Sequence, residues 1–290
     1  MEAQTVQRFS DVLESPQPNP ALPHSLVLVG AGKMGVALLE GWLKSGLDPV
    51  NVAIIDPHPS SEIKQLAAEL GMALNPAAGD IRTPEVLVLA IKPQFLDEAA
   101  PQLAALTSPS TLVISILAGK TLANLAQRWP QVKAIIRAMP NLPASIGRGI
   151  TGVVASSATS EAQRATATAL IASSGAVEWL DDEHLIDALT GVSGSGPAYV
   201  FYLVEALTEA GVAAGLPMDV AQRLARATVT GASALLDESP LSASALREAV
   251  TSKGGTTAAA LDVLQGENGI APIITRAVAA AQKRAAELSG

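Results

Sequence analysis

The sequence contains no cysteine, few aromatic residues and no apolar run long enough to cross a bilayer. Without cysteine the chain can form neither disulfide bonds nor thiolate nucleophiles, which fits a reducing compartment such as the cytoplasm. Aromatic residues make up 3% of the chain, and alanine supplies much of its apolar fraction, which favours closely packed helices. A membrane span needs about 18 consecutive apolar residues, so no membrane-spanning helix is predicted.

Positive charge is also scarce, since the chain contains 19 Lys and Arg residues against 27 Asp and Glu residues. Nucleic acids and anionic membrane surfaces bind basic proteins, so neither is expected as a partner. The first 25 residues contain acids, glutamine and prolines but no apolar core, which predicts a flexible extension rather than a secretory signal. The 290 residues suffice for two domains with substantial cores.

A glycine-rich turn lies between a short apolar strand, residues 26–29, and a helical pattern that runs through Trp42. It reads G-x-G-x-x-G, in which glycines permit a tight turn, close approach of a pyrophosphate and close helix packing. The N-terminus of the helix offers N–H groups and partial positive charge to phosphates, although the motif alone also fits an ordinary strand-to-helix turn. The predicted loop residues are Gly30, Ala31, Gly32, Lys33, Met34 and Gly35.

A second apolar strand, residues 51–55, ends in Asp56, which lies 21 residues beyond Gly35. At this spacing a carboxylate accepts hydrogen bonds from the adenosine ribose of a dinucleotide. Asp56 also precedes Pro57, so it fits the role of a turn residue as well. Strand, glycines, helix and acid together predict a nucleotide site.

Apolar strands alternate with helices from residue 26 to about residue 180, which predicts a parallel α/β sheet of the Rossmann type. Ligands of such sheets bind beyond the carboxyl ends of the strands. The residues that follow the later strands are therefore expected to face the crevice of the glycine loop, although Lys92 also fits a strand cap. They are Lys92, Pro93, Ala118, Met139, Pro140 and Asn141.

Helices alone are predicted beyond residue 181, and several are apolar on nearly every side. Residues 197–215 carry only two charges, Glu205 and Glu209. A helix of this kind must be buried, so we expect a second subunit to cover it, the alternative being a monomer that folds these helices onto its own sheet. The predicted domains are an extension over residues 1–25, a Rossmann domain over 26–180 and a helical domain over 181–290.

Two glycine-rich stretches occur in the helical half, TGVSGSGPAYVFY at residues 190–202 and VTSKGGTTAAAL at residues 250–261. Together with GAGKMG, AIKPQ at residues 90–94 and RAMPN at residues 137–141, they resemble the pyrroline-5-carboxylate reductase family. The resemblance implies NAD(P)H-dependent reduction of 1-pyrroline-5-carboxylate to L-proline, the last step of proline biosynthesis. It also implies a Rossmann domain followed by an all-α dimerisation domain, a homodimer and, in several relatives, a decamer.

The resemblance places the substrate carboxylate on the loop from Ser252 to Thr257. Adjacent glycines flanked by hydroxyls at a helix start form a concavity of N–H donors suited to a carboxylate, although a mere helix cap has the same sequence. The implied carboxylate contacts are Ser252, Gly254, Gly255 and Thr256, and the hydroxyl of Thr257 is implied to reach the ring nitrogen. In the SGSGPAY stretch, Ser195 and Pro197 fit the N-cap and first turn of a helix.

The resemblance also adds Ala90 to the cofactor contacts. Glu183 matches a family glutamate near the substrate, but it equally fits a solvated acid within an acidic run. Arg137 is expected to be a structural ion-pair partner rather than a substrate clamp. No metal site is predicted, and the three histidines, His24, His58 and His184, occupy no catalytic position.

A site without a catalytic histidine suits an imine better than a ketone. Hydride transfer to a ketone develops alkoxide charge and usually needs a positioned acid, whereas a protonated cyclic imine is already electrophilic. It needs orientation, a hydrogen bond at nitrogen and exclusion of water, which a threonine hydroxyl in a closed cleft supplies.

The chain departs from the family pattern in three places. Lys253 replaces the usual proline of the carboxylate loop, which removes stiffness and adds positive charge. Ala78 stands where relatives often carry a cofactor-binding asparagine, so that contact is missing or is made by Asn75. Asp56 replaces the small hydroxyl residue of NADPH-preferring relatives, which tilts the expected coenzyme toward NADH.

Two other functions remain open. A 3-hydroxyacid dehydrogenase has the same two-domain plan but carries a lysine on the first long helix of its second domain, and residues 191–215 contain none. A nucleotide-sensing module would bind the cofactor without turning over any cyclic imine.

Overall fold

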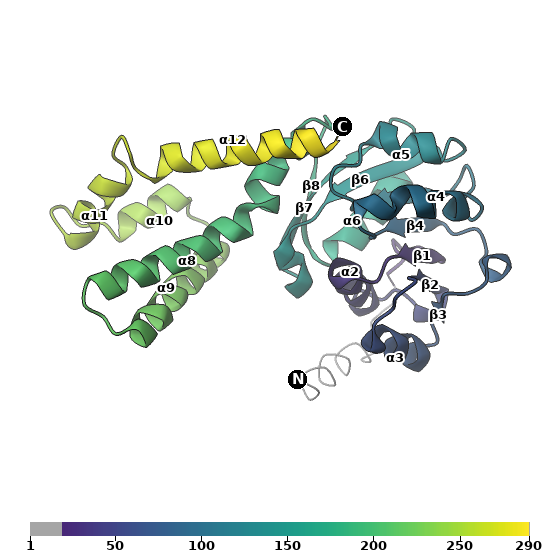
Figure 1. The fold of residues 1–290 in the computed structure, drawn as a ribbon, viewed down its shortest axis with the longest axis horizontal. Coiled ribbons are helices and arrows are strands. Elements are labelled where there is room, and N and C mark those ends of the chain that lie inside the picture. The colour runs from purple at the N-terminus through teal and green to yellow at the C-terminus, as the bar shows by residue number, and fades with distance from the viewer. Residues whose placement is uncertain (1–18, 290) are drawn as a thin grey trace. The chain divides into compact units, whose positions relative to one another are not determined.

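The computed structural model describes residues 19–289, which divide into two compact units (Figure 1). One unit comprises the described part of Met1–Gly194 together with the end of the chain from Gln282, and the other comprises Ser195–Ala281. Most of the predicted extension, residues 1–18, lies outside the described residues. Within residues 19–25, Leu22 is only 6% exposed and joins the hydrophobic core, so this part is packed.

The first unit is built on an eight-stranded sheet with the order β3-β2-β1-β4-β5-β6-β7-β8. The chain moves outward from β1 through β2 to β3 and then returns to β4 on the other side, which makes a topological switch point between β1 and β4. The strands are β1 Leu26–Val29, β2 Val52–Ile55, β3 Ala73–Leu74, β4 Val86–Leu89, β5 Leu112–Ser115, β6 Ala134–Met139, β7 Gly149–Ala155 and β8 Gly175–Trp179.

The sheet is parallel, as predicted, except where β7 meets β6. Strands β1 to β6 pair in parallel, but β7 runs antiparallel to β6, and β8 is parallel to β7. Only the short 3₁₀ segment η4, Leu142–Ile146, connects β6 to β7. A parallel crossover needs a dozen or more residues, so the short connection forces the direction to reverse.

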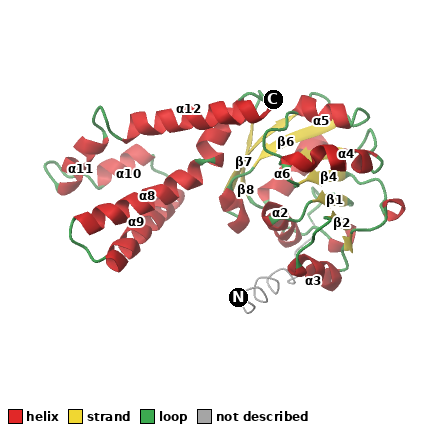
Figure 2. Ribbon diagram, viewed as in Figure 1, coloured by secondary structure: helices red, strands yellow, loops and turns green. Residues whose placement is uncertain are grey.

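Helices cover both faces of this sheet (Figure 2). One hydrophobic cluster joins alternate strand residues to α2, α3 and α6, and a second joins the opposite strand face to α4 and α5. Strand side chains alternate between the two clusters because successive residues of a strand point to opposite faces. The helices of the unit are α2 Lys33–Lys44, α3 Ser61–Leu70, α4 Leu96–Ala104, α5 Leu122–Arg128, α6 Glu161–Ala172 and α7 Leu185–Leu189.

All three tryptophans belong to this unit. Trp42 in α2 is 1% exposed, and its Nε1 donates to the carbonyl oxygen of Leu170 at 2.8 Å, which ties α2 to α6. Trp129 is fully buried on the other face of the sheet. The guanidinium of Arg164 lies over the ring of Trp179 in β8, 4.7 Å from the centroid of that ring.

The sheet unit continues past the boundary predicted at residue 180, as far as Gly194. Helix α7 is the reason, because its residue Ile186 is fully buried and its acid Asp187 lies beside Arg137 of β6. No strand follows β8 among the described residues, as the α/β-then-helical fold class predicts.

The second unit is helical and buries few of its own side chains. Helices α8, Gly196–Ala213, and α9, Met218–Glu238, pack together where Gly211 lies beside Ala221, and α10, Ala243–Ala249, and α11, Thr256–Leu264, follow. Helix α12, Ile270–Ser289, begins in this unit and ends in the first. None of the described helices is long and apolar enough to cross a membrane.

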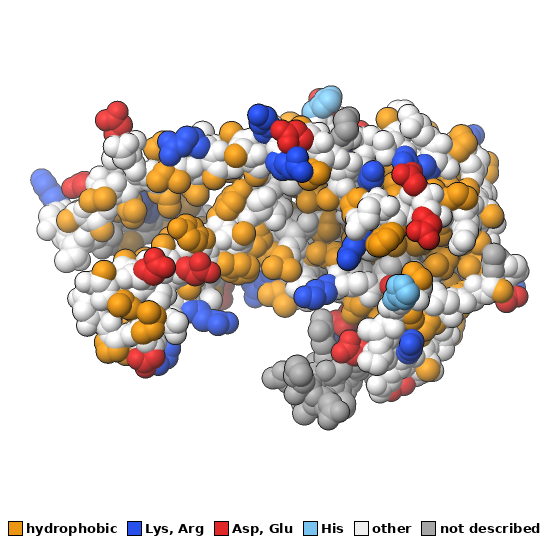
Figure 3. Space-filling view, in the orientation of Figure 1, with side chains coloured by type: hydrophobic (Ala, Val, Ile, Leu, Met, Phe, Trp, Pro, Cys, Tyr) orange, Lys and Arg blue, Asp and Glu red, His pale blue; other side chains and the backbone are white. Residues whose placement is uncertain are grey.

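Many large apolar side chains of this unit are exposed, and the space-filling view shows hydrophobic atoms at its surface (Figure 3). Only Thr208, Ala221 and Ala225 are buried in α8 and α9. Large exposed apolar patches are typical of interaction sites and ligand-binding grooves. The exposed residues with large apolar side chains on α8 and α9 include Phe201, Tyr202, Leu203, Leu207, Leu224, Leu235 and Leu236.

A pair of glycine substitutions tests the packing of α2 against β1. A Cβ atom at Gly35 would overlap the carbonyl oxygen of Gly30, so Gly35→Ala should lower the free energy of unfolding by about 1–3 kcal/mol. Gly32 has no neighbour within 4 Å of the same position. In Gly32→Ala the weaker N-cap and the reduced entropy of the unfolded chain offset one another, so its stability should change by about 0.5 kcal/mol or less. Urea denaturation measures both, and equal stability of the two variants would contradict the assignment.

Candidate functional site

An open cleft of about 1000 Å³ lies over the glycine loop of the sheet unit. The loop, α2 along its whole length, the end of β2, the segment after β6 and the end of α6 form its walls. As predicted, glycine loop and Asp56 meet at one site. The lining residues are Ala31, Gly32, Lys33, Met34, Val36, Glu40, Gly41, Lys44, Asp56, His58, Ser60, Glu62, Leu142, Ser145, Ile146, Gly147 and Ser173.

The glycine loop passes between the carboxyl ends of β2 and β4. Gly30 has φ +92°, and its N–H donates to the carbonyl oxygen of Ile55 at 2.8 Å. A Cβ there would lie 2.8 Å from the backbone of Ala90, so only glycine fits. Gly32, the N-cap of α2, is exposed and makes no side-chain cap. The first N–H groups of α2 therefore face the cleft side of the loop without a side-chain acceptor, an arrangement suited to phosphate.

Asp56 is half-buried at the end of β2, and both of its carboxylate oxygens are engaged. Oδ2 accepts from the N–H of Ala31 at 2.7 Å, and Oδ1 accepts from the N–H of His58 at 2.8 Å. The first contact crosses from β2 to the glycine loop, and the second closes a local turn. Asp56 thus serves as a turn residue and also lines the cleft, and its contact with a ribose stays a prediction.

Asn75 makes its contacts with Asp56. Its Oδ1 accepts from the N–H of Asp56 at 2.8 Å, and its Nδ2 donates to the carbonyl oxygen of Asp56 at 2.7 Å. Asn75 is absent from the cleft lining.

The other predicted cofactor residues lie at the carboxyl ends of later strands but do not line this cleft. Ala90 packs against Gly30, and Lys92 is exposed at the start of the short 3₁₀ segment Pro93–Phe95. Ala118 is exposed after β5. Asn141 is 9% exposed, and its Oδ1 accepts from the N–H of Ile150 at 3.1 Å, which fixes the β6–β7 connection.

Several cleft residues were not found from sequence. Glu40 and Lys44 lie about two and three turns along α2, and η4 contributes Leu142, Ser145 and Ile146. Leu142 and Ile146 are 55% and 76% exposed. The usable signal was their position just past Asn141, because residues after a parallel strand share the edge of the sheet where ligands bind.

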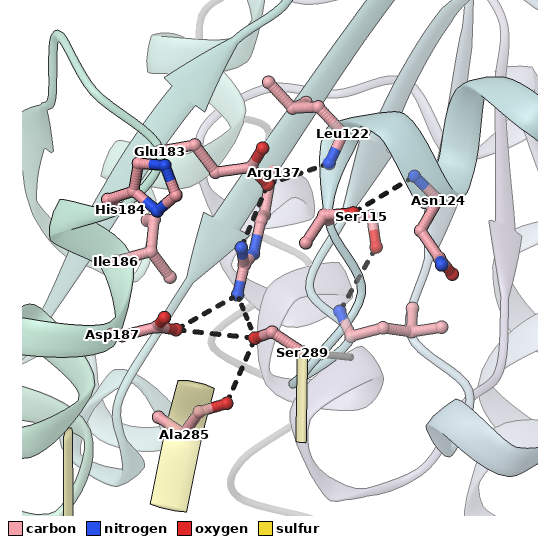
Figure 4. Close-up of polar contacts among 12 residues, drawn as sticks. Ser115, Leu122, Asn124, Arg137, Glu183, His184, Ile186, Asp187, Ala285 and Ser289 are labelled. Atoms are coloured by element: carbon pink, nitrogen blue, oxygen red, sulfur yellow. Dashed lines mark hydrogen bonds and ion pairs between the residues drawn. The ribbon is translucent and has the colours of Figure 1, made fainter. Parts of the chain in front are cut away.

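Arg137 forms the centre of a second polar group in the sheet unit (Figure 4). Its side chain is 5% exposed, with Nη1 2.9 Å from Oε1 of Glu183 and Nη2 3.8 Å from Oδ1 of Asp187. The hydroxyl of Ser289, at the end of α12, accepts from Nη2 of Arg137 and donates to Oδ1 of Asp187, each at 3.4 Å. The expected role of Arg137 as a structural ion-pair partner is confirmed.

Glu183 has partners on both sides. Its Oε1 accepts from Arg137 and, at 2.8 Å, from the N–H of Leu122 in the first turn of α5. It is therefore not a freely solvated acid, one of the two roles expected from sequence. Its contact with substrate stays a prediction.

In the helical unit, the stretch before α11 forms a glycine turn. Gly254 has φ +70°, and the N–H of Gly255 donates to the carbonyl oxygen of Ser252 at 3.0 Å. Gly255 is the N-cap of α11 and lacks a side-chain cap, whereas α10 is capped by the hydroxyl of Ser242. The first N–H groups of α11 thus have no side-chain acceptor within their own turn. Thr257 is half-buried in this first turn.

Ser195 differs from its prediction in one respect. Helix α8 begins at Gly196 with Pro197 in its first turn, as expected, but Ser195 makes no side-chain cap. Its φ of −86° and ψ of −22° are already helical, and a capping side chain needs an extended backbone at that position.

No group of three or more potential metal ligands occurs among residues 19–289.

Comparison with known proteins covers both units. Residues 183–288 match the family model described as pyrroline-5-carboxylate reductase dimerisation, and residues 25–119 match the one described as NADP oxidoreductase coenzyme F420-dependent. The pyrroline-5-carboxylate reductase of Pseudomonas aeruginosa is 37% identical over 265 residues, covering 91% of this chain and 96% of the relative. That of Synechocystis is 40% identical over 266 residues, covering 91% and 97%. The structure of a pyrroline-5-carboxylate reductase from Coxiella burnetii superposes with a TM-score of 0.85 at 32% identity, covering 92% of this chain and 99% of the other. Because this identity extends over nearly the whole of each chain, the protein belongs to the pyrroline-5-carboxylate reductase family.

Proposed function

We propose that this chain reduces 1-pyrroline-5-carboxylate to L-proline, the final step of proline biosynthesis, with NAD(P)H as the hydride donor. The observation that carries the proposal is the glycine-loop cleft in a chain that matches named reductases along nine-tenths of its length. The uncapped turn before α11 supports it as a carboxylate site. The cytoplasm is the proposed location, in keeping with a chain that lacks cysteine.

The coenzyme cleft has three proposed parts. The N–H groups at the start of α2 receive the pyrophosphate near Gly32, and Asp56 accepts hydrogen bonds from the adenosine ribose. Exposed apolar groups of Leu142 and Ile146 cover one wall and exclude water. The further proposed contacts are Ala31, Lys33, Met34, Ala90, Lys92, Pro93, Ala118 and Asn141.

The proposed substrate site is the turn from Ser252 to Thr257, with Glu183 as an additional contact. The carboxylate of the cyclic imine is held by Ser252, Gly254, Gly255 and Thr256. Its proposed backbone donors are the N–H groups of Gly254 and Thr256, because the N–H of Gly255 already donates to the carbonyl oxygen of Ser252. Lys253 adds positive charge beside it. The hydroxyl of Thr257 forms a hydrogen bond at the ring nitrogen and keeps the imine oriented and protonated.

The chemistry is a two-electron reduction. When bound, the coenzyme supplies a hydride to the imine carbon, and the C=N double bond becomes a single bond as its electron pair moves to nitrogen. The nitrogen keeps the proton it carried, so the product is the amine and no separate acid is consumed. For this reduction the protein therefore needs to supply only a hydroxyl at the ring nitrogen and a cleft that excludes water.

The exposed helices α8 and α9 support a homodimer through the helical unit, which matches the dimerisation model of the family. A decamer of five such dimers is the larger assembly that the resemblance suggests.

The activity is tested by coenzyme oxidation in the presence of 1-pyrroline-5-carboxylate, beside 1-pyrroline-2-carboxylate and 3-hydroxyisobutyrate. Turnover of the first with little turnover of the others supports the proposal. Oxidation of the hydroxyacid alone would indicate a 3-hydroxyacid dehydrogenase, and coenzyme binding without any turnover would indicate a nucleotide sensor.

Removing the hydroxyl of Thr257 should slow reduction of the imine. A hydrogen bond to a charged group contributes about 1.5–3 kcal/mol, so Thr257→Ala should lower kcat/KM for the imine about ten- to a hundredfold. Coenzyme affinity should change less. Thr257→Ser keeps the hydroxyl and should recover most of the activity. An alanine variant within about twofold of the parent would remove Thr257 from the mechanism.

The full chain should sediment as a dimer or a larger assembly. The helical unit of a single chain exposes large apolar side chains to water, and assembly would bury them. Sedimentation velocity at micromolar concentration, with activity followed over the same dilution series, measures this. Introducing charge by Leu203→Glu should weaken assembly, whereas Gln222→Glu, at an exposed polar position, should not. An active monomer would overturn the proposal.

NADH should serve at least as well as NADPH. A carboxylate near a 2′-phosphate at ~4 Å and an effective dielectric near 20 costs about 4 kcal/mol per unit-charge pair. Turning Asp56 away would leave the N–H of Ala31 without its acceptor. Asp56→Ser should therefore shift the ratio of kcat/KM values toward NADPH by about tenfold or more. A parent enzyme that strongly prefers NADPH, with an unchanged ratio in Asp56→Ser, would confine Asp56 to the turn.

A further inference from the structure

Asn75 extends the pairing of two strands with its side chain. Strands β2 and β3 pair up to Ile54 and Leu74, and the N–H of Asn75 donates to the carbonyl oxygen of Ile54 at 2.8 Å. Beyond that point the amide of Asn75 takes over, accepting from the N–H of Asp56 and donating to its carbonyl oxygen at 2.8 and 2.7 Å. One side chain thereby satisfies both backbone groups of Asp56, as a third strand residue would.

This arrangement depends on an unusual backbone conformation. Asn75 has φ +48°, the only positive φ of a non-glycine residue in the described part of the chain. Asparagine adopts this left-handed region more readily than most residues, but it still carries a cost. Strained conformations of this kind persist where the surrounding contacts over-determine them, and the two bonds to Asp56 are such contacts.

The contacts form a chain that ends in the glycine loop. Asn75 holds the backbone of Asp56, and the carboxylate of Asp56 accepts from Ala31 and His58. Ala31, Asp56 and His58 line the cleft, whereas Asn75 does not. Asn75 therefore acts on the cleft only through Asp56.

We propose that Asn75 is a positioning residue that fixes the carboxylate of Asp56 at the ribose end of the coenzyme site and so strengthens the preference for a coenzyme without a 2′-phosphate. The inference rests on the coenzyme site proposed above. A fixed carboxylate accepts hydrogen bonds from ribose hydroxyls without first losing conformational freedom. The same fixed charge repels a phosphate, because the backbone that carries it cannot swing aside.

Loosening Asp56 therefore affects the two coenzymes in opposite ways. NADH loses a preorganised acceptor, so its KM rises. NADPH loses part of the repulsion, so its KM changes little or falls. A purely structural loosening of the loop would instead weaken both coenzymes alike, which makes the ratio between them the informative quantity.

The test substitutes Asn75 by glycine, which accepts a positive φ and removes only the side-chain bonds. Asn75→Gly should lower the NADH-to-NADPH ratio of kcat/KM values about three- to tenfold, mainly through KM for NADH, with kcat within about twofold. Asn75→Ala also removes both side-chain bonds without adding charge, at the cost of strain at a positive φ, and it should shift the ratio in the same direction. Ala77→Gly loosens the same loop at an exposed position without a side-chain bond and should leave the ratio unchanged.

A double substitution separates action through Asp56 from any other effect. In an Asp56→Ser background the charge is gone, so adding Asn75→Gly should change the ratio by less than about twofold. An equal shift with and without Asp56, or an unchanged ratio in both soluble Asn75 variants, would overturn the inference. If Asn75→Gly fails to fold, Asn75→Ala decides.

Calorimetric titration of NADH and NADPH without imine gives the same comparison as a ratio of Kd values. A shifted Kd ratio in a chain that reduces no imine would leave the role of Asn75 standing while the proposed reductase activity fails. An unshifted Kd ratio in an active reductase would overturn the role of Asn75 and leave the reductase activity standing.

Discussion

The contact that the coenzyme unit depends on is the approach of α2 to the end of β1. Gly35 lies against the carbonyl oxygen of Gly30, and Gly30 lies against the backbone of Ala90, just past the end of the neighbouring strand β4. No side chain fits between them, so helix, turn and two strands are held at backbone separation. That separation aims the start of α2 at the cleft and brings Ala31 within hydrogen-bond distance of Asp56. The electrostatic part of the site is thus a consequence of steric fit.

Local patterns were enough to predict much of the fold. Strand β1 occupies the predicted residues 26–29, and β2 begins one residue later than predicted, at Val52. Helix α3 has a sequence signal at each end, because the hydroxyl of Ser60 caps its start and Gly71 takes φ +71° at its end. Strand β3 was missed because two residues give no period, and α4 because it contains Pro101. The direction of β7 depends on a connection whose 3₁₀ turns have no clear sequence signal.

The class of site could be predicted from the sequence, but the contacts between its side chains could not. The glycine loop, Asp56 and the family were found from spacing and motifs, and the family is confirmed. Which groups engage one another depends on pairs far apart in the chain, such as Arg137 with Glu183 or Asp56 with Asn75. A sequence lists these side chains without their partners, so Asn75 could be expected only as a replacement ligand. Its bonds to the backbone of Asp56 became visible once β3 was placed beside β2.

Tryptophan and tyrosine are distributed unequally between the two units, so each unit has its own spectroscopic signal. Trp42, Trp129 and Trp179 all lie in the sheet unit, whereas both tyrosines, Tyr199 and Tyr202, lie on α8 of the helical unit. Indole emission therefore reports on the nucleotide-binding half alone, and phenol absorbance on the helical half alone. Unfolding followed at the two signals would coincide only if the halves melt as one cooperative unit. The protein thus carries a separate intrinsic chromophore for each half, without any added label.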